Sequence, residues 1–217
     1  MKWKGYWRNT EICKGAGSDA LRDLSLHLMD ILQNSITAGA GRIEARLQAE
    51  AGILVMSVRD NGCGMDRELL ERVVDPFTTT RKTRKIGLGI PLLKAAAERA
   101  SGGLRIDSRK GEGTTVTATF DIRNIDRPPL GDIAETVTGV ILANPETNLK
   151  LRLEGDGEAF KLDTEEIKER LGEVPIVEYE VLTWIGEYVK EGITAIFGGV
   201  LDEIDSGTGR NKKENPG

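Results

Sequence analysis

The chain has few of the residues that build metal centres and disulfide frameworks. Its 217 residues include one histidine, His27, and two cysteines, Cys13 and Cys63, which stand 50 positions apart. No Cys/His cluster has the spacing of zinc ligands, so we expect no zinc site, whereas a divalent ion held by oxygen atoms stays open. A disulfide would restrict the glycine-rich loop around Cys63. We therefore expect free thiols in a reducing compartment.

Long apolar runs are also missing. No stretch approaches the roughly 18 apolar residues that a membrane-spanning helix needs. The first eight residues, MKWKGYWR, are basic but lack the apolar stretch and the small-residue cleavage site of a secretory signal. We expect a cytoplasmic protein that has no membrane partner.

Charge is divided unequally along the chain. Residues 1–120 hold 19 Lys and Arg against 14 Asp and Glu, a balance of +5, whereas residues 121–217 hold 11 against 21, a balance of −10. The basic part suits a small anionic ligand, but its excess is too mild to indicate a nucleic-acid partner. The length fits one domain with an extension, or two unequal domains.

Hydrophobic periodicity predicts an α+β fold for the first 122 residues. Apolar residues at helical spacing follow Ser18-Asp19, a capping signal, and the runs after Gly41 and Gly52 alternate as half-exposed strands. The order of elements indicates a two-layer α/β sandwich, with helices on one face of a mixed, mainly antiparallel sheet. The predicted helices cover 19–38, 67–73 and 89–100, and the predicted strands cover 43–48, 53–58, 104–108 and 114–122.

The second part of the chain begins after Arg127-Pro128-Pro129, which marks a boundary. We predict an amphipathic helix over 133–141, a hairpin that turns at 155–157, and two further helices, of which the last covers 182–196. The polar, glycine-containing stretch from Ser206 onwards predicts disorder.

Asp30 and Asn34 are four residues apart, so they project from one face of the first predicted helix. An amide oxygen is a suitable Mg²⁺ ligand, and a carboxylate one turn away can orient a water molecule or accept a proton. Taken alone, the pair also fits an ordinary polar helix face.

Asp60 ends a predicted strand and leads into Gly62 and Gly64. A buried carboxylate there can accept a hydrogen bond from an exocyclic amine, and the two glycines let a flat base lie against the backbone. Met65 would add an adaptable apolar contact to a ring. The alternative is a plain turn between a strand and a helix.

Gly87, Leu88 and Gly89 precede a helix, whose free N–H groups and partial positive charge favour phosphate. Thr114 and Thr115 could bond a base through their hydroxyls. A solvated basic loop and an ordinary strand start are the alternatives. The basic side chains that could reach the same phosphates are Arg81, Lys82, Arg84 and Lys85. Together these signals indicate a purine triphosphate with Mg²⁺, in a site other than the Walker type, because no Gly-x-x-x-x-Gly-Lys-Ser/Thr occurs.

The motifs resemble those of the GHKL superfamily, which comprises type II topoisomerase ATPase domains, heat-shock chaperones, histidine kinases and mismatch-repair ATPases. Residues 30–40, DILQNSITAGA, resemble its N box, and residues 60–64, DNGCG, its G1 box. Residues 75–80, DPFTTT, together with Gly87-Leu88-Gly89, are similar to the F and G2 boxes of histidine kinases, and residues 111–115, GEGTT, to the last box. The match covers about residues 20–122.

The resemblance implies a Bergerat-type ATP-binding domain, with Asn34 on Mg²⁺, Asp60 on the adenine amino group, Asp30 as the catalytic residue, and a lid over ATP from Thr78 to Gly89. We divide the chain into an N-terminal arm (1–18), the ATP-binding domain (19–124), a C-terminal α/β extension (125–203) and a tail (204–217). The residues implied to contact ATP are Asn34, Ala38, Asp60, Gly62, Gly64, Met65, Thr79, Thr80, Arg81, Lys82, Lys85, Gly87, Leu88, Gly89, Thr114 and Thr115.

The resemblance favours a kinase-like protein over a hydrolase. Hydrolytic members place glutamate where this chain has Asp30, whereas kinases vary more there because an acceptor side chain attacks phosphorus in place of water. His27 lies within the N-box helix, so we expect the phosphoacceptor to belong to a partner protein. Three functions stay open: a Mg²⁺-dependent kinase-like protein that phosphorylates or regulates a partner in trans, a non-catalytic ATP sensor, and an ATP-hydrolysing gated homodimer.

Overall fold

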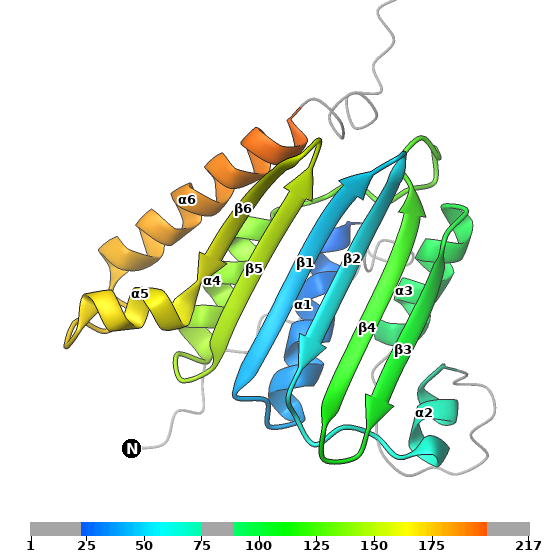
Figure 1. The fold of residues 1–217 in the computed structure, drawn as a ribbon, viewed down its shortest axis with the longest axis horizontal. Helices are drawn as coiled ribbons and strands as arrows, with labels where there is room; N and C mark the ends of the chain where they lie inside the picture. The colour runs from blue at the N-terminus through cyan, green and yellow to red at the C-terminus, as the bar shows by residue number, and fades with distance from the viewer. Residues whose placement is uncertain (1–22, 75–88, 199–217) are drawn as a thin grey trace, which may run out of the picture.

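One six-stranded sheet, with helices packed against it, makes up the part of the chain that the structure describes (Figure 1). The computed structural model describes residues 23–74 and 89–198. In chain order the elements are α1 (Leu24–Thr37), β1 (Arg42–Glu50), β2 (Ile53–Asp60), α2 (Arg67–Val74), α3 (Gly89–Arg99), β3 (Gly103–Arg109), β4 (Gly113–Asp121), α4 (Ile133–Ala143), β5 (Asn148–Gly155), β6 (Glu158–Asp163), α5 (Thr164–Leu171) and α6 (Tyr179–Phe197).

The strands lie in the order β3-β4-β2-β1-β5-β6. Neighbouring strands are antiparallel except β1 and β5, which run parallel. Figure 1 shows α1, α3 and α4 behind the sheet, so the helices share one face. The predicted two-layer α+β sandwich with a mixed, mainly antiparallel sheet is therefore confirmed.

Among the described residues, one apolar core lies between the two layers. Alternate residues of the central strands, such as Leu47 and Met56, are buried beneath Leu28 and Leu32 of α1. Successive side chains of a strand point to opposite faces of the sheet. Burial of one face therefore explains why apolar and polar residues alternate in the sequence. The apolar side of α1 packs against the buried face of β1 and β2. This packing places the end of α1 beside the end of β2.

The first helix begins later than the sequence predicts. Asp23, not Asp19, is its N-cap, since the Asp23 carboxylate accepts from the Leu26 N–H at 2.9 Å and the Asp23 backbone is extended. The start is also tied to the boundary segment, because Leu24 N–H donates to the Pro129 carbonyl at 2.9 Å. The predicted start at residue 19 is wrong, while the other elements up to Asp121 agree with prediction to within two residues.

Residues 125–198 continue the same sheet and the same core. β5 pairs in parallel with β1, and β5 and β6 form the predicted hairpin across 155–157. Ile133 and Val137 of α4, and Val189 of α6, are buried in the common core. The extension therefore covers the edge of β1 and is packed into the structure that carries the first half of the chain.

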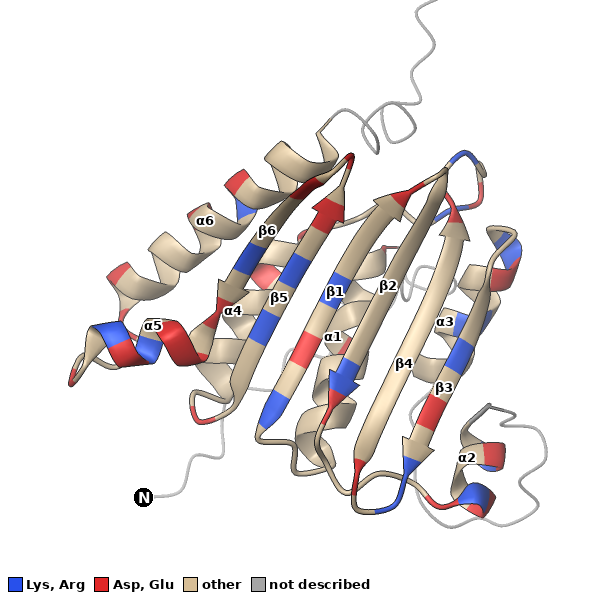
Figure 2. Ribbon diagram, viewed as in Figure 1, with Lys and Arg blue, Asp and Glu red and all other residues tan. Residues whose placement is uncertain are grey.

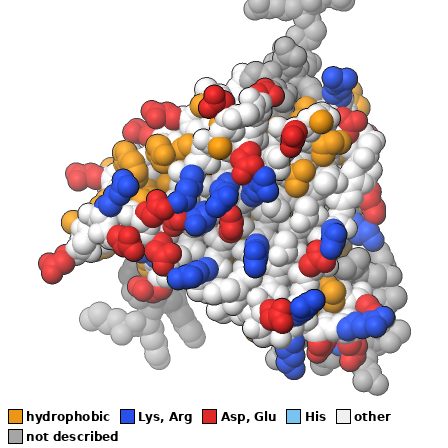
Figure 3. All heavy atoms as spheres, in the orientation of Figure 1, with side chains coloured by type: hydrophobic (Ala, Val, Ile, Leu, Met, Phe, Trp, Pro, Cys, Tyr) orange, Lys and Arg blue, Asp and Glu red, His pale blue; other side chains and the backbone are white. Residues whose placement is uncertain are grey.

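The face of the sheet opposite the helices is polar. Figure 2 shows bands of both charges along β1, β5 and β6, and Figure 3 shows basic and acidic side chains mixed over the middle of this face. Cross-strand ion pairs connect them, including Arg152 with Glu44 and Lys150 with Asp163, both at 2.9 Å. This pattern is that of a sheet with one face in water. Among the described helices, none is both long and apolar enough to cross a bilayer.

Candidate functional site

The carboxylate of Asp60 is fixed by three hydrogen bonds. Oδ2 accepts from the Ser35 hydroxyl at 2.9 Å, and Oδ1 accepts from the backbone N–H groups of Gly62 at 2.8 Å and Thr114 at 3.2 Å. Asp60 ends β2, and its residue exposure is only 9%. An ionised carboxylate offers about four lone-pair positions, so these three donors leave room for one further N–H donor from a ligand.

The loop that follows Asp60 is held from two sides. On the helix side, Cys63 N–H donates to the carbonyl of Ala38, the C-cap of α1, at 2.9 Å. On the strand side, Gly111 N–H donates to the Cys63 carbonyl at 2.8 Å, and Met65 N–H donates to the Ser108 hydroxyl at 2.8 Å. The loop thus has a fixed course between α1 and the β3–β4 turn.

Both glycines of this loop are required by close packing. A Cβ atom on Gly62 would lie 2.9 Å from the Cβ of Ala38, and one on Gly64 would lie 2.0 Å from the carbonyl oxygen of Arg109. Gly64 also has a φ of +61°, which side-chain-bearing residues rarely adopt. The two glycines therefore let the loop pack closely against its neighbours, and the loop backbone runs beside Asp60.

Asp30 and Asn34 project from α1 one turn apart. Asp30 is half-buried, and burial raises the pKa of its carboxyl group above the ordinary value. Its neighbour is the start of α3, since a Cβ atom on Gly89 would come within 2.7 Å of Asp30 Oδ2. Asn34 is exposed. The helix N-terminus at Gly89 therefore lies next to a carboxylate that could take a proton.

The structure brings together most of the predicted site residues that it describes. The ends of α1 and β2, the loop after β2, and the starts of α3 and β4 gather Asp30, Asn34, Ala38, Asp60, Gly62, Gly64, Met65, Gly89 and Thr114. Thr115 is not among them, because it pairs with Arg59 and its side chain lies on the opposite face of the sheet from Asp60. Seven predicted contacts lie outside the described residues, namely Thr79, Thr80, Arg81, Lys82, Lys85, Gly87 and Leu88.

Two serines were missed by the sequence reasoning. Ser35 is 2% exposed and donates to Asp60, and Ser108 accepts from Met65 N–H while lying 2.9 Å from the Thr114 hydroxyl. Ser35 stands in the apolar stripe of α1, where a buried polar group needs a partner. A serine at an apolar position of the helix could therefore have indicated a buried hydrogen bond. Ser108 carries no comparable signal, because a serine in an edge strand is common.

The oxygen donors at this site fit a Mg²⁺ ion that arrives with a nucleotide. The described residues contain no group of three His, Cys, Asp or Glu side chains that could hold a metal by themselves. Mg²⁺ is usually bound through one or two protein oxygens, with substrate phosphates and waters completing the octahedron. The Asn34 amide oxygen, one turn from Asp30, is the donor that this arrangement offers.

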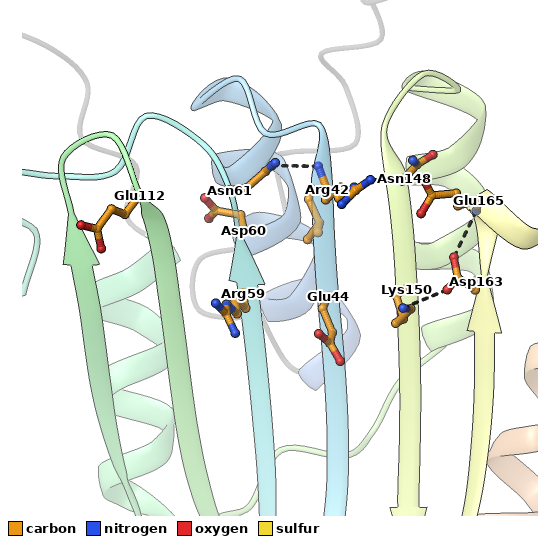
Figure 4. A pocket seen from close by; sticks show the side chains of 11 residues that line it. Arg42, Glu44, Arg59, Asp60, Asn61, Glu112, Asn148, Lys150, Asp163 and Glu165 are labelled. Atoms are coloured by element: carbon orange, nitrogen blue, oxygen red, sulfur yellow. Dashed lines mark hydrogen bonds and ion pairs between the residues drawn. The ribbon is translucent and has the colours of Figure 1, made fainter.

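A hollow lies on the uncovered face, beside the same end of β2. Figure 4 shows Arg42, Glu44, Arg59 and Lys150 around it, with charges of both signs. Lys150 is paired with Asp163 at 2.9 Å. Asn61, the residue after Asp60, accepts from Arg42 N–H at 2.8 Å through its side-chain oxygen. The hollow thus lies between the loop after β2 and the C-terminal extension, and side chains of both signs line it.

A comparison with protein families identifies this arrangement. Residues 20–124 match the family described as "Histidine kinase-, DNA gyrase B-, and HSP90-like ATPase". This part of the chain is a GHKL ATPase domain. The region matched holds the Asp30–Asn34 pair, the loop after Asp60 and the Thr114 strand, so the GHKL domain contains every described part of the candidate site.

Several similar curated proteins are bacterial sensors and sensor kinases. "Putative sensor protein" of Shewanella frigidimarina (strain NCIMB 400) is 28% identical over 115 residues, which are 52% of this chain and 18% of that protein. "Signal transduction histidine-protein kinase AtoS" of Escherichia coli (strain K12) is 35% identical over 98 residues, 44% of this chain and 16% of that protein. The chain therefore aligns with less than a fifth of these relatives.

Among solved structures, the Aquifex aeolicus MutL ATPase domain in complex with ADP has a TM-score of 0.44 and 20% identity to this chain. The superposition covers 70% of this chain and 68% of that one. This similarity is too weak to carry a functional conclusion.

Proposed function

We propose that the GHKL domain binds ATP with Mg²⁺ and transfers the γ-phosphoryl group to a partner protein. The observation that carries the proposal is the Asp60 carboxylate, with three hydrogen bonds from the chain and one lone-pair position left. The exocyclic amine of adenine is an N–H donor of the kind that this position accepts. A guanine base offers an oxygen there, which a carboxylate would repel.

Asn34 and Asp30 would act at the phosphate end. Asn34 would supply one oxygen to Mg²⁺, and the bound ion would neutralise phosphate charge. The N-terminus of α3, which begins at Gly89, would face the γ-phosphate. The acceptor atom of the partner forms a bond to phosphorus while the bond to the ADP oxygen breaks. The proton released by the acceptor passes to Asp30, whose raised pKa makes it a better base than an exposed carboxylate.

The reaction is proposed for this site alone, because the aligned segment is less than a fifth of each relative. The partner is a protein that presents a side-chain acceptor, and the reaction belongs in the cytoplasm. The exposed free thiol of Cys63 is consistent with a reducing compartment.

Transfer of label from ATP tests the proposal. The chain is incubated with γ-labelled ATP, Mg²⁺ and the proteins encoded by neighbouring genes, and label is followed on protein. We expect transfer to one of them, lowered about 100-fold or more in Asp30→Asn. Label that stays on nucleotide with every partner would contradict phosphotransfer.

An ATP sensor is the second candidate, favoured by one set of contacts. Asn61, beside the adenine-binding carboxylate, holds Arg42 N–H, and the Arg42 guanidinium lies 3.4 Å from Glu165 of α5. These contacts connect the nucleotide site to the extension. Under this function, nucleotide-dependent capture of a partner would survive Asp30→Ala and be lost in Asp60→Ala. Phosphotransfer would instead make Asp30 essential.

A further inference from the structure

We propose that β3 pairs with β3 of a second copy, so that two sheets join edge to edge across a two-fold axis at Ile106. β3 is the outermost strand on its side of the sheet, and no described strand pairs with its outer edge. Such an edge presents unpaired N–H and C=O groups along its length. The proposal goes beyond the ATP site and does not depend on phosphotransfer.

The two faces of β3 differ in a way that suits a partner strand. Leu104 and Ile106 face the helix layer, where they pack against the core but stay partly exposed. Arg105 and Asp107 face the uncovered side, where they form an ion pair with each other at 2.7 Å but keep side-chain exposures of 77% and 56%. A partner strand would cover the remaining surface of Leu104 and Ile106, and no proline or inward-pointing charge within β3 opposes pairing.

Charge fixes the register of the pairing. In an antiparallel pair the residues directly opposite each other lie on one face, so a two-fold axis must pass through a residue. An axis at Arg105 or at Asp107 would set like charges opposite each other. An axis at Ile106 sets Arg105 of each copy opposite Asp107 of the other and places the two Ile106 side chains together. An axis at Ser108 would set Asp107 opposite Arg109 of the other copy, but Arg105 would then stand opposite residue 111, outside β3. The register at Ile106 is therefore the one that gives both Arg105 and Asp107 an opposite charge.

The other edge strand is less available. The hydroxyl of Tyr188 on α6 lies 3.4 Å from the backbone carbonyl of Lys161 in β6 and occupies that acceptor. Asp163, the last residue of β6, is 8% exposed, is bound by Lys150 and caps α5. β6 therefore leads at once into a helix. By contrast, α2 lies near one end of β3 in Figure 1, and its Val73 packs against the core.

The expected dimer is weak. β3 has seven residues, and one added strand of this length buries less than the roughly 1,200 Å² of a stable complex. Association should therefore depend on concentration, and each cross-strand charge pair should shift it measurably.

Charge reversal with exchange of partners tests both the edge and the register. Sedimentation velocity follows the full chain from about 10 µM to about 1 mM. Arg105→Asp and Asp107→Arg should each weaken self-association at least about tenfold, because each sets like charges opposite each other.

Mixed in equal amounts, the two variants should form a heterodimer, since the two acidic positions of one strand then face the two basic positions of the other. Arg152→Asp, the same change on β5, is the control and should associate like the wild type.

The thermal midpoint of each variant establishes that it is folded. Loss of self-association in both variants with recovery on mixing supports the proposal. Three results would overturn it: a wild-type chain that stays monomeric at about 1 mM, variants that associate like the wild type, or a mixture that does not recover.

Discussion

The carboxylate of Asp30 lies directly against the backbone of Gly89. A Cβ atom on Gly89 would come within 2.7 Å of Asp30 Oδ2 and 3.0 Å of its Cβ. Glycine at the first position of α3 is thus what lets that helix N-terminus approach the half-buried carboxylate. The contact joins the N-box helix to the helix that begins at Gly89, the two elements that the proposed chemistry needs.

Gly89→Ala should displace Asp30 or α3 and lower phosphotransfer more than it lowers stability. Alanine is a better helix former than glycine, so the free energy of unfolding should change by less than about 1 kcal/mol. The rate of transfer should fall about tenfold or more, because misplacement of a catalytic group by about 1 Å has large effects. Gly139→Ala in α4, whose nearest neighbour is 3.7 Å away, is the matched control. Equal rates in both variants would refute a role for the contact.

Asp60→Asn should change base preference as well as affinity. The amide keeps one oxygen but introduces N–H donors, which cannot accept from adenine. A hydrogen bond to a charged group contributes about 1.5–3 kcal/mol, so ATP should bind roughly ten- to a hundredfold more weakly, and GTP should lose less. Calorimetric titration with both nucleotides measures this. Asp121→Asn, the same change at the far end of β4, should leave ATP binding unaltered, and an equal loss for both nucleotides would argue against base recognition by Asp60.

The rate of phosphotransfer should fall with acidity at a pH above the ordinary range of an aspartate. Burial raises the pKa of Asp30 above 3.8, so this base becomes protonated earlier as the pH falls. The ionised form acts as the base, and activity is therefore full above the raised pKa and lost below it. Single-turnover transfer across the pH range, with circular dichroism to establish folding at each pH, gives the apparent pKa. A limb at or below 3.8 would exclude Asp30 as the titrating group.

Gly192→Ala should destabilise the whole protein through the extension. A Cβ atom on Gly192 of α6 would lie 2.5 Å from the ring of Phe160 on β6. Overpacking of this kind costs about 1–3 kcal/mol. Because both halves share one core, unfolding in urea should stay a single transition with a lower midpoint. Gly186→Ala, 3.6 Å from Thr138, should have little effect. A separate early transition would show that the extension unfolds by itself.

The parts of the site that depend on local pattern could be predicted from the sequence. Alternation along β2 placed Asp60 at a strand end, and helical spacing placed Asp30 and Asn34 on one face of α1. Such signals are local, because the periodicity of side chains follows directly from the geometry of a strand or a helix.

Contacts between distant segments could not be predicted in the same way. Asp19 and Asp23 carry the same capping signal, and the backbone bond from Leu24 to Pro129 favours the second. Ser35 reaches Asp60 only because α1 packs across β2, 25 positions along the chain. The parallel pairing of β1 with β5 also leaves no trace in either strand, since alternation shows which face is buried but not which strand is the neighbour.

His27→Leu should stabilise the protein, most of all in mild acid. His27 lies in α1 with 1% exposure, and neither ring nitrogen has a hydrogen-bond partner among the described residues. Desolvation by burial lowers its pKa, Asp23 opposes this shift, and Arg99 adds to it. As the pH falls below 6.5, His27 therefore becomes protonated in the unfolded chain while it stays neutral in the folded chain, and the free energy of unfolding decreases.

Leucine fills a similar volume without polar atoms, so the variant should lose this pH dependence. Urea denaturation between about pH 5 and pH 8 measures it, with His27→Gln, which keeps polar atoms but does not titrate, as the control. A slope that is the same in wild type and His27→Leu would show that another group is responsible for the acid sensitivity.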